Sequence, residues 1–180
     1  RNRAIIALMV FEGFRVSTIQ ELKKGHILEK KGRKGLLIFE KGKGKTEQNR
    51  RQTPILHTTA MMLHEYTEAL PMDDNKYLFH SLNGMKKGGQ LSCVTISQTV
   101  KKQLLRIGLT SKKYTAHSLR HTFGTLLAKA EVPIRSIQLK MGHESQTTTE
   151  NYIKNKINDK EWLSPSHAVL SEVLDIRTLN

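Results

Sequence analysis

The residues best suited to chemistry lie in the second half of the chain. His117 and Arg120 are three residues apart, so on a helix their side chains share one face and can converge on one small anion. The guanidinium fork of arginine matches two phosphate oxygens, and histidine exchanges a proton near neutral pH. His143 and Tyr152 follow nine residues apart, and the polar, turn-like residues 144–149 allow the chain to double back between them. These types and spacings indicate a phosphate-binding site with a tyrosine beside it.

The order and spacing of these residues resemble the C-terminal signature of the tyrosine recombinases, the family of phage integrases and Xer proteins. That signature is His-x-x-Arg, then Leu-Gly-His, then a tyrosine nine residues after the second histidine. The chain matches it at residues 117–120, at residues 141–143 and at Tyr152. Met141 replaces the usual leucine and nearly conserves its volume. Several positions matched at the right spacing make this resemblance far more specific than a single motif.

The first part of the chain matches two more positions of the family's active site. Within residues 11–19, Phe-Glu-Gly-Phe-Arg-Val-Ser-Thr-Ile, the last eight correspond to the family pattern Thr-Gly-Leu-Arg-x-Ser-Glu-Leu, so Arg15 takes the place of the first catalytic arginine. The family's catalytic lysine lies at a β-hairpin tip in a Gly-Lys-Gly-like stretch, which this chain also has. The resemblance therefore implies Lys43 as that lysine, with Lys41 and Lys45 as alternatives.

The resemblance spans residues 4–155 and implies a transesterification that needs no metal and no high-energy cofactor. Tyr152 would attack a DNA phosphodiester in line, forming a 3′-phosphotyrosyl bond and releasing a 5′-hydroxyl. The covalent intermediate keeps the bond energy for rejoining to a different strand. The function implied is that of a site-specific DNA recombinase or integrase of a mobile element, and we expect no cofactor.

The other matched residues receive roles in this reaction. The transition state carries extra negative charge on its nonbridging oxygens, and Arg15 and Arg120 would stabilise that charge. His117 is the candidate general base for the tyrosine proton, and Lys43 is the candidate general acid for the leaving 5′-oxygen. His143 would donate a hydrogen bond to the phosphate. The chain also has no grouping of carboxylates suited to a pair of magnesium ions.

The composition agrees with a DNA partner. Of 180 residues, 30 are Lys or Arg and 16 are Asp or Glu, which gives a formal net charge of +14. Such an excess indicates a polyanion, and nucleic acid is favoured over an anionic membrane surface. We expect a basic group around the hairpin to contact DNA phosphates, although a merely solvated face is the alternative. Its members are Lys23, Lys24, Lys41, Lys45, Arg50 and Arg51.

The sequence also favours a protein of the bacterial cytoplasm, associated with the nucleoid. No stretch approaches the roughly 20 apolar residues that span a bilayer, and the first residues lack a signal-peptide pattern. We therefore predict no membrane partner. Cys93 is the only cysteine, so an internal disulfide or a cysteine-based zinc site is not expected, and we predict a small core residue.

Two histidines could be read as a metal site. His117 and His121 are four residues apart, the spacing of a metal pair on a helix, and His143 could be a third ligand. The residues between them lack the glutamate base of zinc hydrolases. We therefore predict no metal and a structural or supporting role for His121.

The elements that must position these residues form, by prediction, a mainly helical domain with a small antiparallel sheet, the fold of the tyrosine recombinase catalytic domain. Apolar residues at helical spacing predict most of the elements. Two short β-type runs with a glycine-bearing stretch between them predict a hairpin. The predicted helices cover residues 4–11, 17–22, 58–70, 93–107, 117–130, 134–141 and 148–153, and the strands cover 36–39 and 53–56.

We predict one catalytic domain over residues 1–180, with a core at 1–155 and a tail helix at 156–180. The apolar stripe from Ala168 to Leu174 could dock on a neighbouring protomer, which predicts tetramers on DNA. An N-terminal DNA core-binding domain is expected outside these residues. Accessory DNA-bending or excision factors are further candidate partners.

Three alternatives remain open. The residues from Gly124 to His143 resemble a helix-turn-helix, which would suit a non-enzymatic DNA-binding regulator. A basic RNA-associated module would explain the charge alone. Within the recombinase family, an Xer-type chromosome-dimer resolvase competes with the integrase; the long hairpin and the tail after Tyr152 favour the integrase.

Overall fold

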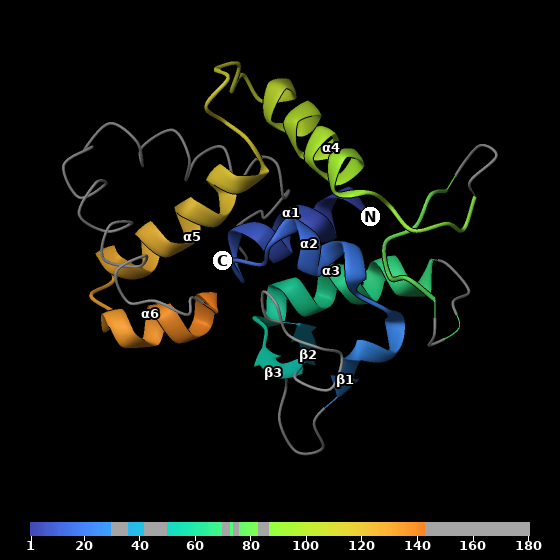
Figure 1. Ribbon diagram of the computed structural model, residues 1–180, viewed down its shortest axis with the longest axis horizontal. Helices are drawn as coiled ribbons and strands as arrows, with labels where there is room; N and C mark the ends of the chain where they lie inside the picture. The colour runs from blue at the N-terminus through green and yellow to red at the C-terminus, as the bar shows by residue number, and fades with distance from the viewer. Residues whose placement is uncertain (30–35, 42–49, 70–72, 74–75, 83–86, 143–180) are drawn as a thin grey trace, which may run out of the picture.

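The computed structural model describes residues 1–29, 36–41, 50–69, 73, 76–82 and 87–142 (Figure 1). Its helices are α1 (Asn2–Val10), α2 (Val16–Glu21), the short 3₁₀ helix η1 (Lys24–His26), α3 (His57–Glu68), α4 (Cys93–Arg106), α5 (Ala116–Lys129) and α6 (Ile134–Met141). Its strands are β1 (Ile27–Glu29), β2 (Leu36–Lys41) and β3 (Arg50–Pro54). The predicted fold class, mainly helical with a small antiparallel sheet, is confirmed.

The sheet contains the predicted hairpin. Strands β2 and β3 pair antiparallel, with Ile38 opposite Thr53 and Lys41 opposite Arg50. The predicted range 53–56 for the second strand is wrong, because the polar residues 50–52 extend the ladder and Pro54, which has no N–H, ends it. The short strand β1, not predicted, pairs with β2 and completes the order β1-β2-β3.

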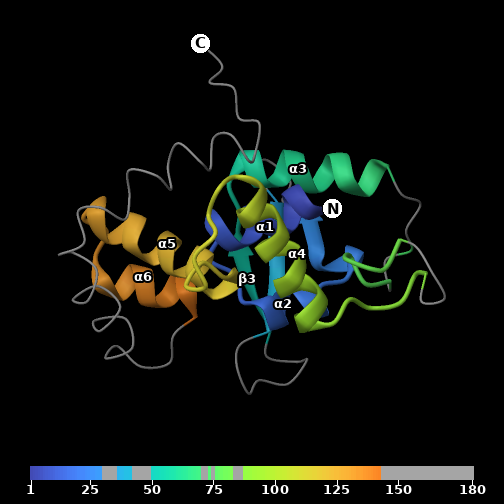
Figure 2. The same ribbon diagram turned by 90° about the horizontal axis from the view of Figure 1, so that it is seen from above.

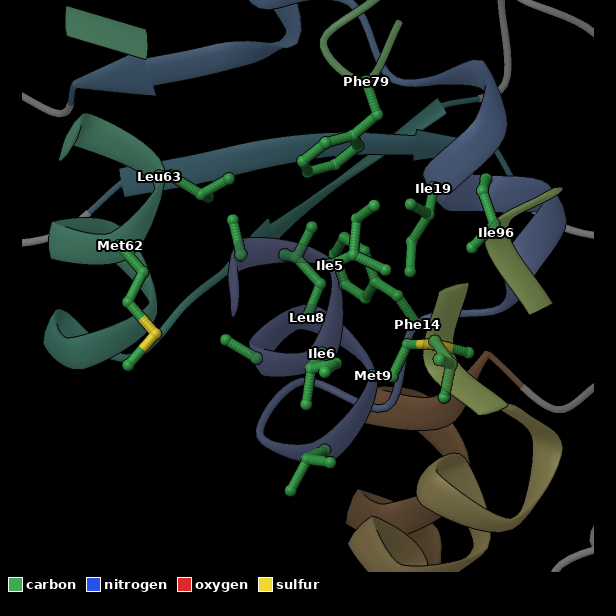
Figure 3. Packing of buried hydrophobic residues seen from close by; sticks show 14 of the residues in the cluster. Ile5, Ile6, Leu8, Met9, Phe14, Ile19, Met62, Leu63, Phe79 and Ile96 are labelled. Atoms are coloured by element: carbon green, nitrogen blue, oxygen red, sulfur yellow. The ribbon is translucent and has the colours of Figure 1, made fainter. Parts of the chain in front are cut away.

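Helix α1 lies at the centre of the fold and packs against α2, α3, α4 and α5 (Figure 1). Every residue from Ala4 to Val10 is buried. A helix that is apolar on all sides must be covered on all sides, and this is what the surrounding helices do. In Figure 3 the side chains of Ile5, Leu8 and Met9 lie among apolar residues of α2, α3 and α4.

Helices α5 and α6 form a pair beside this core (Figure 2). The hydroxyl of Thr115 accepts from the N–H of Ser118 at 3.4 Å, and the hydroxyl of Ser118 accepts from the N–H of Thr115 at 2.9 Å. This capping box fixes where α5 begins. Helix α6 ends at Gly142, whose φ of 61° is left-handed and favours glycine. The pair shares a small apolar cluster of Phe123, Ile137 and Met141.

The remaining helix predictions hold within a residue or two where the structure describes the chain. Helix α4 begins after its cap Ser92, whose hydroxyl accepts from the N–H of Thr95 at 3.1 Å. Of the apolar residues predicted on it, Ile96 is buried, whereas Val94 is 64% exposed because it lies on the solvent side. The predicted helix at 148–153 and the tail at 156–180 lie outside the described residues.

Candidate active site

Arg120 is a buried cation held by two backbone carbonyls. Its side chain projects from α5, and only 5% of the residue is exposed. One guanidinium nitrogen donates to the carbonyl of Gly13 and the other to the carbonyl of Met141. A buried guanidinium requires acceptors, and these two carbonyls are neutral. These bonds therefore fix the orientation of the group without cancelling its positive charge.

Arg15 is held at the same helix end. It is the N-cap residue of α2, in extended conformation, and its Nη2 donates to the carbonyl of Gly142 at 2.9 Å. Met141 and Gly142 lie at the C-terminus of α6, where unpaired carbonyls carry the negative end of the helix dipole. One helix end thus orients both predicted catalytic arginines.

His117 lies one turn before Arg120 on α5 and is exposed. Partial desolvation lowers the pKa of His117, and the positive charges of Arg120 and Arg15 lower it further. A lowered pKa keeps the imidazole neutral near pH 7, which is the form that can accept a proton. The influence of both guanidinium groups on this ring places the three residues in one electrostatic environment.

Gly13 makes the close approach of the α1–α2 loop to α5 possible. Its φ is +67°, and a Cβ at this position would lie 2.4 Å from Cδ1 of Phe123. The left-handed backbone and the contact with the ring both require a residue without a side chain. This contact brings the carbonyl of Gly13 to the guanidinium of Arg120.

Glu12 is a buried carboxylate next to Gly13 that the sequence analysis did not single out. Its side chain is fully buried, with an exposed fraction of 0%. One carboxylate oxygen accepts from the N–H of Leu56 and from the hydroxyl of Thr59, both at 2.8 Å. The other accepts from Nζ of Lys140 at 3.1 Å. A signal was present, because a carboxylate next to the long apolar run of α1 must find a partner when it is buried.

Several predicted residues lie outside the described part of the chain. These are the candidate nucleophile, the candidate general acid, one further histidine and one lysine: Tyr152, Lys43, His143 and Lys45. The structure describes the backbone of the hairpin residues Lys41, Arg50 and Arg51 but not their side chains. Lys23 and Lys24 lie at the start of η1 and are half-buried. The structure therefore brings together Arg15, His117 and Arg120.

Other predicted features can be placed among the described residues. The rings of His117 and His121 meet edge to face, with centroids 4.3 Å apart. Within the described ranges, no three His, Cys, Asp or Glu residues are grouped as a metal would require. Cys93 is half-buried and donates to Oε1 of Gln20 at 2.8 Å, and burial raises the pKa of its thiol. No helix in the described part of the chain is long and apolar enough to cross a bilayer.

Comparison with known proteins gives the same family throughout. The phage integrase family model matches residues 1–159. Tyrosine recombinase XerC of Caldanaerobacter subterraneus subsp. tengcongensis is 34% identical over 157 residues, which are 84% of this chain and 40% of the relative. XerC of Rickettsia massiliae is 32% identical over 163 residues, 89% of this chain and 49% of the relative. The chain thus spans half or less of the length of these relatives.

Solved structures agree with the sequence relatives. The XerH site-specific recombinase bound to a palindromic difH substrate, in a post-cleavage complex, superimposes with a TM-score of 0.68 and 29% identity. That match covers 84% of this chain and 41% of XerH. The XerA recombinase superimposes with a TM-score of 0.69 and 27% identity, covering 94% of this chain and 56% of XerA. The chain therefore belongs to the phage integrase family, the tyrosine recombinases.

Proposed function

We propose that residues 1–180 form the catalytic domain of a site-specific DNA recombinase, which cleaves and rejoins strands through a covalent 3′-phosphotyrosine at Tyr152. The observation that carries this proposal is the pair of arginines, Arg15 and Arg120, held on adjacent carbonyls of one helix end. Two oriented cations with a neutral imidazole beside them suit a phosphodiester whose charge increases as it is attacked.

The two arginines differ in what they can contribute. Arg120 is buried and rigidly held, so it would meet a nonbridging oxygen with little reorganisation. Arg15 is half-buried at the start of α2 and would approach the same phosphate from the solvent side. Together they would neutralise the two nonbridging oxygens of the pentacoordinate transition state.

Proton transfers complete the proposed reaction. His117 would take the proton from the tyrosine hydroxyl as the oxygen attacks phosphorus, and its lowered pKa favours the neutral form required. Lys43 would protonate the 5′-oxygen as its bond to phosphorus breaks, and His143 would donate a hydrogen bond to the phosphate. Rejoining reverses these steps, with a 5′-hydroxyl of another strand displacing the tyrosine.

A suicide substrate tests the proposal directly. We expect the full-length protein to form a covalent adduct with DNA that carries a nick near the cleavage site, and to do so in excess chelator, because the proposed reaction uses no metal. Tyr152→Phe should abolish the adduct while DNA binding persists. Tyr114→Phe is the matched control, because this half-buried tyrosine has no proposed role.

The outcomes separate the alternatives. An adduct that survives Tyr152→Phe would make the nucleophile assignment wrong. Absence of any adduct with the intact protein would favour the helix-turn-helix regulator, in which α5 and α6 serve only to bind DNA.

The proposed partner is double-stranded DNA, bound by homotetramers with accessory DNA-bending or excision factors, in the cytoplasm of a bacterial host. The net charge of +14 supports the DNA partner. We assign the phosphate contacts to the group Lys23, Lys24, Lys41, Lys45, Arg50 and Arg51, and the tetramer contact to the tail at 156–180. Truncation after about Lys160 should weaken assembly; unchanged assembly and recombination would remove this part of the proposal.

Two kinds of recombinase are candidates within the family. We propose an integrase of a mobile element, supported by the long hairpin and the tail after Tyr152. The XerC relatives at 31–34% identity favour the second candidate, an Xer-type chromosome-dimer resolvase. Deleting the gene in its host decides between them, since loss of a resolvase leaves unresolved chromosome dimers, whereas loss of an integrase stops excision of the element.

A further inference from the structure

The buried ion pair between Glu12 and Lys140 joins two segments that are far apart in sequence. The carboxylate is fully buried, the side chain of Lys140 is 28% exposed, and Nζ lies 3.1 Å from Oε2 of Glu12. A buried carboxylate is costly unless it is paired and hydrogen-bonded, and this one accepts from a lysine, a hydroxyl and a backbone N–H. The pair is therefore a fixed point of the fold.

Both members of the pair lie next to residues whose carbonyls hold the arginines. Glu12 immediately precedes Gly13, whose carbonyl accepts from Arg120. Lys140 immediately precedes Met141 and Gly142, whose carbonyls accept from Arg120 and Arg15. The ion pair thus ties the two backbone segments that hold the arginines, one residue from the acceptor in the first segment and one and two residues from the acceptors in the second.

We propose that Glu12 and Lys140 are positioning residues for strand cleavage, which set the spacing of these carbonyls and so the placement of Arg120 and Arg15 against the scissile phosphate. The proposal rests on the proposed recombinase function. It assigns no contact with DNA to either residue. Its physical basis is that a displacement of about 1 Å in a catalytic group can slow a reaction roughly 100-fold.

The same pair also anchors the end of the hairpin. Nζ of Lys140 donates to the carbonyl of Pro54, the last residue of β3, at 2.6 Å. Glu12 accepts from Leu56 and Thr59, at the start of α3. The pair therefore fixes where β3 ends relative to the arginine-binding carbonyls. The bonds from Lys140 to Pro54 and to Glu12 link the hairpin to the arginine site.

Three variants separate positioning from stability. Lys140→Met leaves the buried carboxylate without its cation and should lower the unfolding temperature. Glu12→Gln keeps an oxygen for Leu56 and Thr59 but removes the charge. The double variant Glu12→Gln/Lys140→Met removes both charges, so no unpaired buried charge remains and the unfolding temperature should recover most of the loss. Despite that recovery, we expect single-turnover cleavage by the full-length double variant to be roughly 10- to 100-fold slower at saturating DNA.

A second substrate tests whether the loss passes through the arginines. In a methylphosphonate diester, a methyl group replaces one nonbridging oxygen and removes the charge that the arginines meet. The double variant should lose much less rate on the methylphosphonate than on the phosphate diester. Arg120→Ala should likewise lose more rate on the phosphate diester than on the methylphosphonate. The exposed pair of Arg3 and Glu65, 4.0 Å apart, supplies the control: Arg3→Met/Glu65→Gln should leave both rates unchanged.

The results that would overturn the proposal are specific. A double variant that cleaves phosphate at the wild-type rate removes the positioning role. Equal losses on the two substrates would mean that the pair acts on something other than the arginines. Failure of the recombinase function itself looks different, because wild-type protein then forms no adduct or Tyr152→Phe still forms one.

Discussion

The centre of the molecule and its arginine site are built in opposite ways. Along α1, every side chain from Ala4 to Val10 is buried and apolar, so none of them needs a polar partner. Between α5, α6 and the α1–α2 loop, the buried groups include Glu12, Arg120, Thr122 and Gln138, and the apolar cluster is small. The first region obtains stability from area removed from water. The second holds two cations by hydrogen bonds to main-chain atoms, at the expense of apolar burial.

The largest expected effect is a loss of stability from a substitution in the apolar centre. Leu8→Ala opens a cavity beside fully buried neighbours, and the free energy of unfolding should fall by about 2–5 kcal/mol. Denaturant unfolding measures this loss. Below the lowered unfolding temperature, single-turnover cleavage should stay near the wild-type rate; a parallel loss of cleavage would show that the two regions are not separable.

A substitution in the arginine site should have the opposite result, with cleavage lost more than stability. Arg120→Lys keeps a positive charge but cannot reach the carbonyls of Gly13 and Met141 with a planar fork. Cleavage should fall about 100- to 1000-fold, or about 2.7–4 kcal/mol of transition-state stabilisation. Suicide-substrate kinetics measure it, with Lys112→Arg as an exposed control. Wild-type cleavage by Arg120→Lys would mean that charge alone suffices.

Gly13→Ala acts on the junction between the regions. A left-handed backbone costs a residue with a side chain about 1–2 kcal/mol, and the added Cβ must also displace the ring of Phe123. We expect a moderate loss of stability together with slower cleavage, since the displaced Gly13 carbonyl is an acceptor for the guanidinium of Arg120. If thermal unfolding changes and the cleavage rate does not, the loop does not position the arginine.

The pH dependence is a smaller test of the same site. The pKa of His117 is lowered from 6.5 by partial desolvation and then by Arg120 and Arg15. The neutral base is therefore present above this lowered pKa. Cleavage should be lost only at a pH below 6.5, as the pH falls through the lowered pKa of His117. Arg15→Gln removes one nearby charge and should move this acid limb upward, towards 6.5. A limb that does not move would exclude His117 as the group that titrates.

The sequence predicts the apolar half of this comparison well. Helical spacing of apolar residues is a local signal, and it places α1, α4, α5 and α6 within a residue or two. Strand β1, with three residues, is too short for such a signal, and the polar start of β3 hides the strand in composition. Pairing with β2 defines the extent of both strands, and such pairing is not a local preference of the sequence.

The site divides in a similar way. Arg15, His117 and Arg120 are predictable because their types and spacing match a known signature. The structure brings the two arginines to one helix end, with His117 one turn before Arg120 on α5. The pairing of Glu12 with Lys140 spans 128 positions, so only the tertiary structure reveals it. Lys43, His143 and Tyr152 stay predictions from the sequence.

The use of carbonyl groups to hold the arginines has an evolutionary consequence. Main-chain acceptors do not depend on which side chain a residue carries, so mutations at such positions are tolerated when the path of the backbone is kept. Met141, which stands where the family signature has leucine, still offers its carbonyl to Arg120. Lineages of this family could thus diverge widely in sequence while retaining one fold, as a TM-score of 0.68 at 29% identity illustrates.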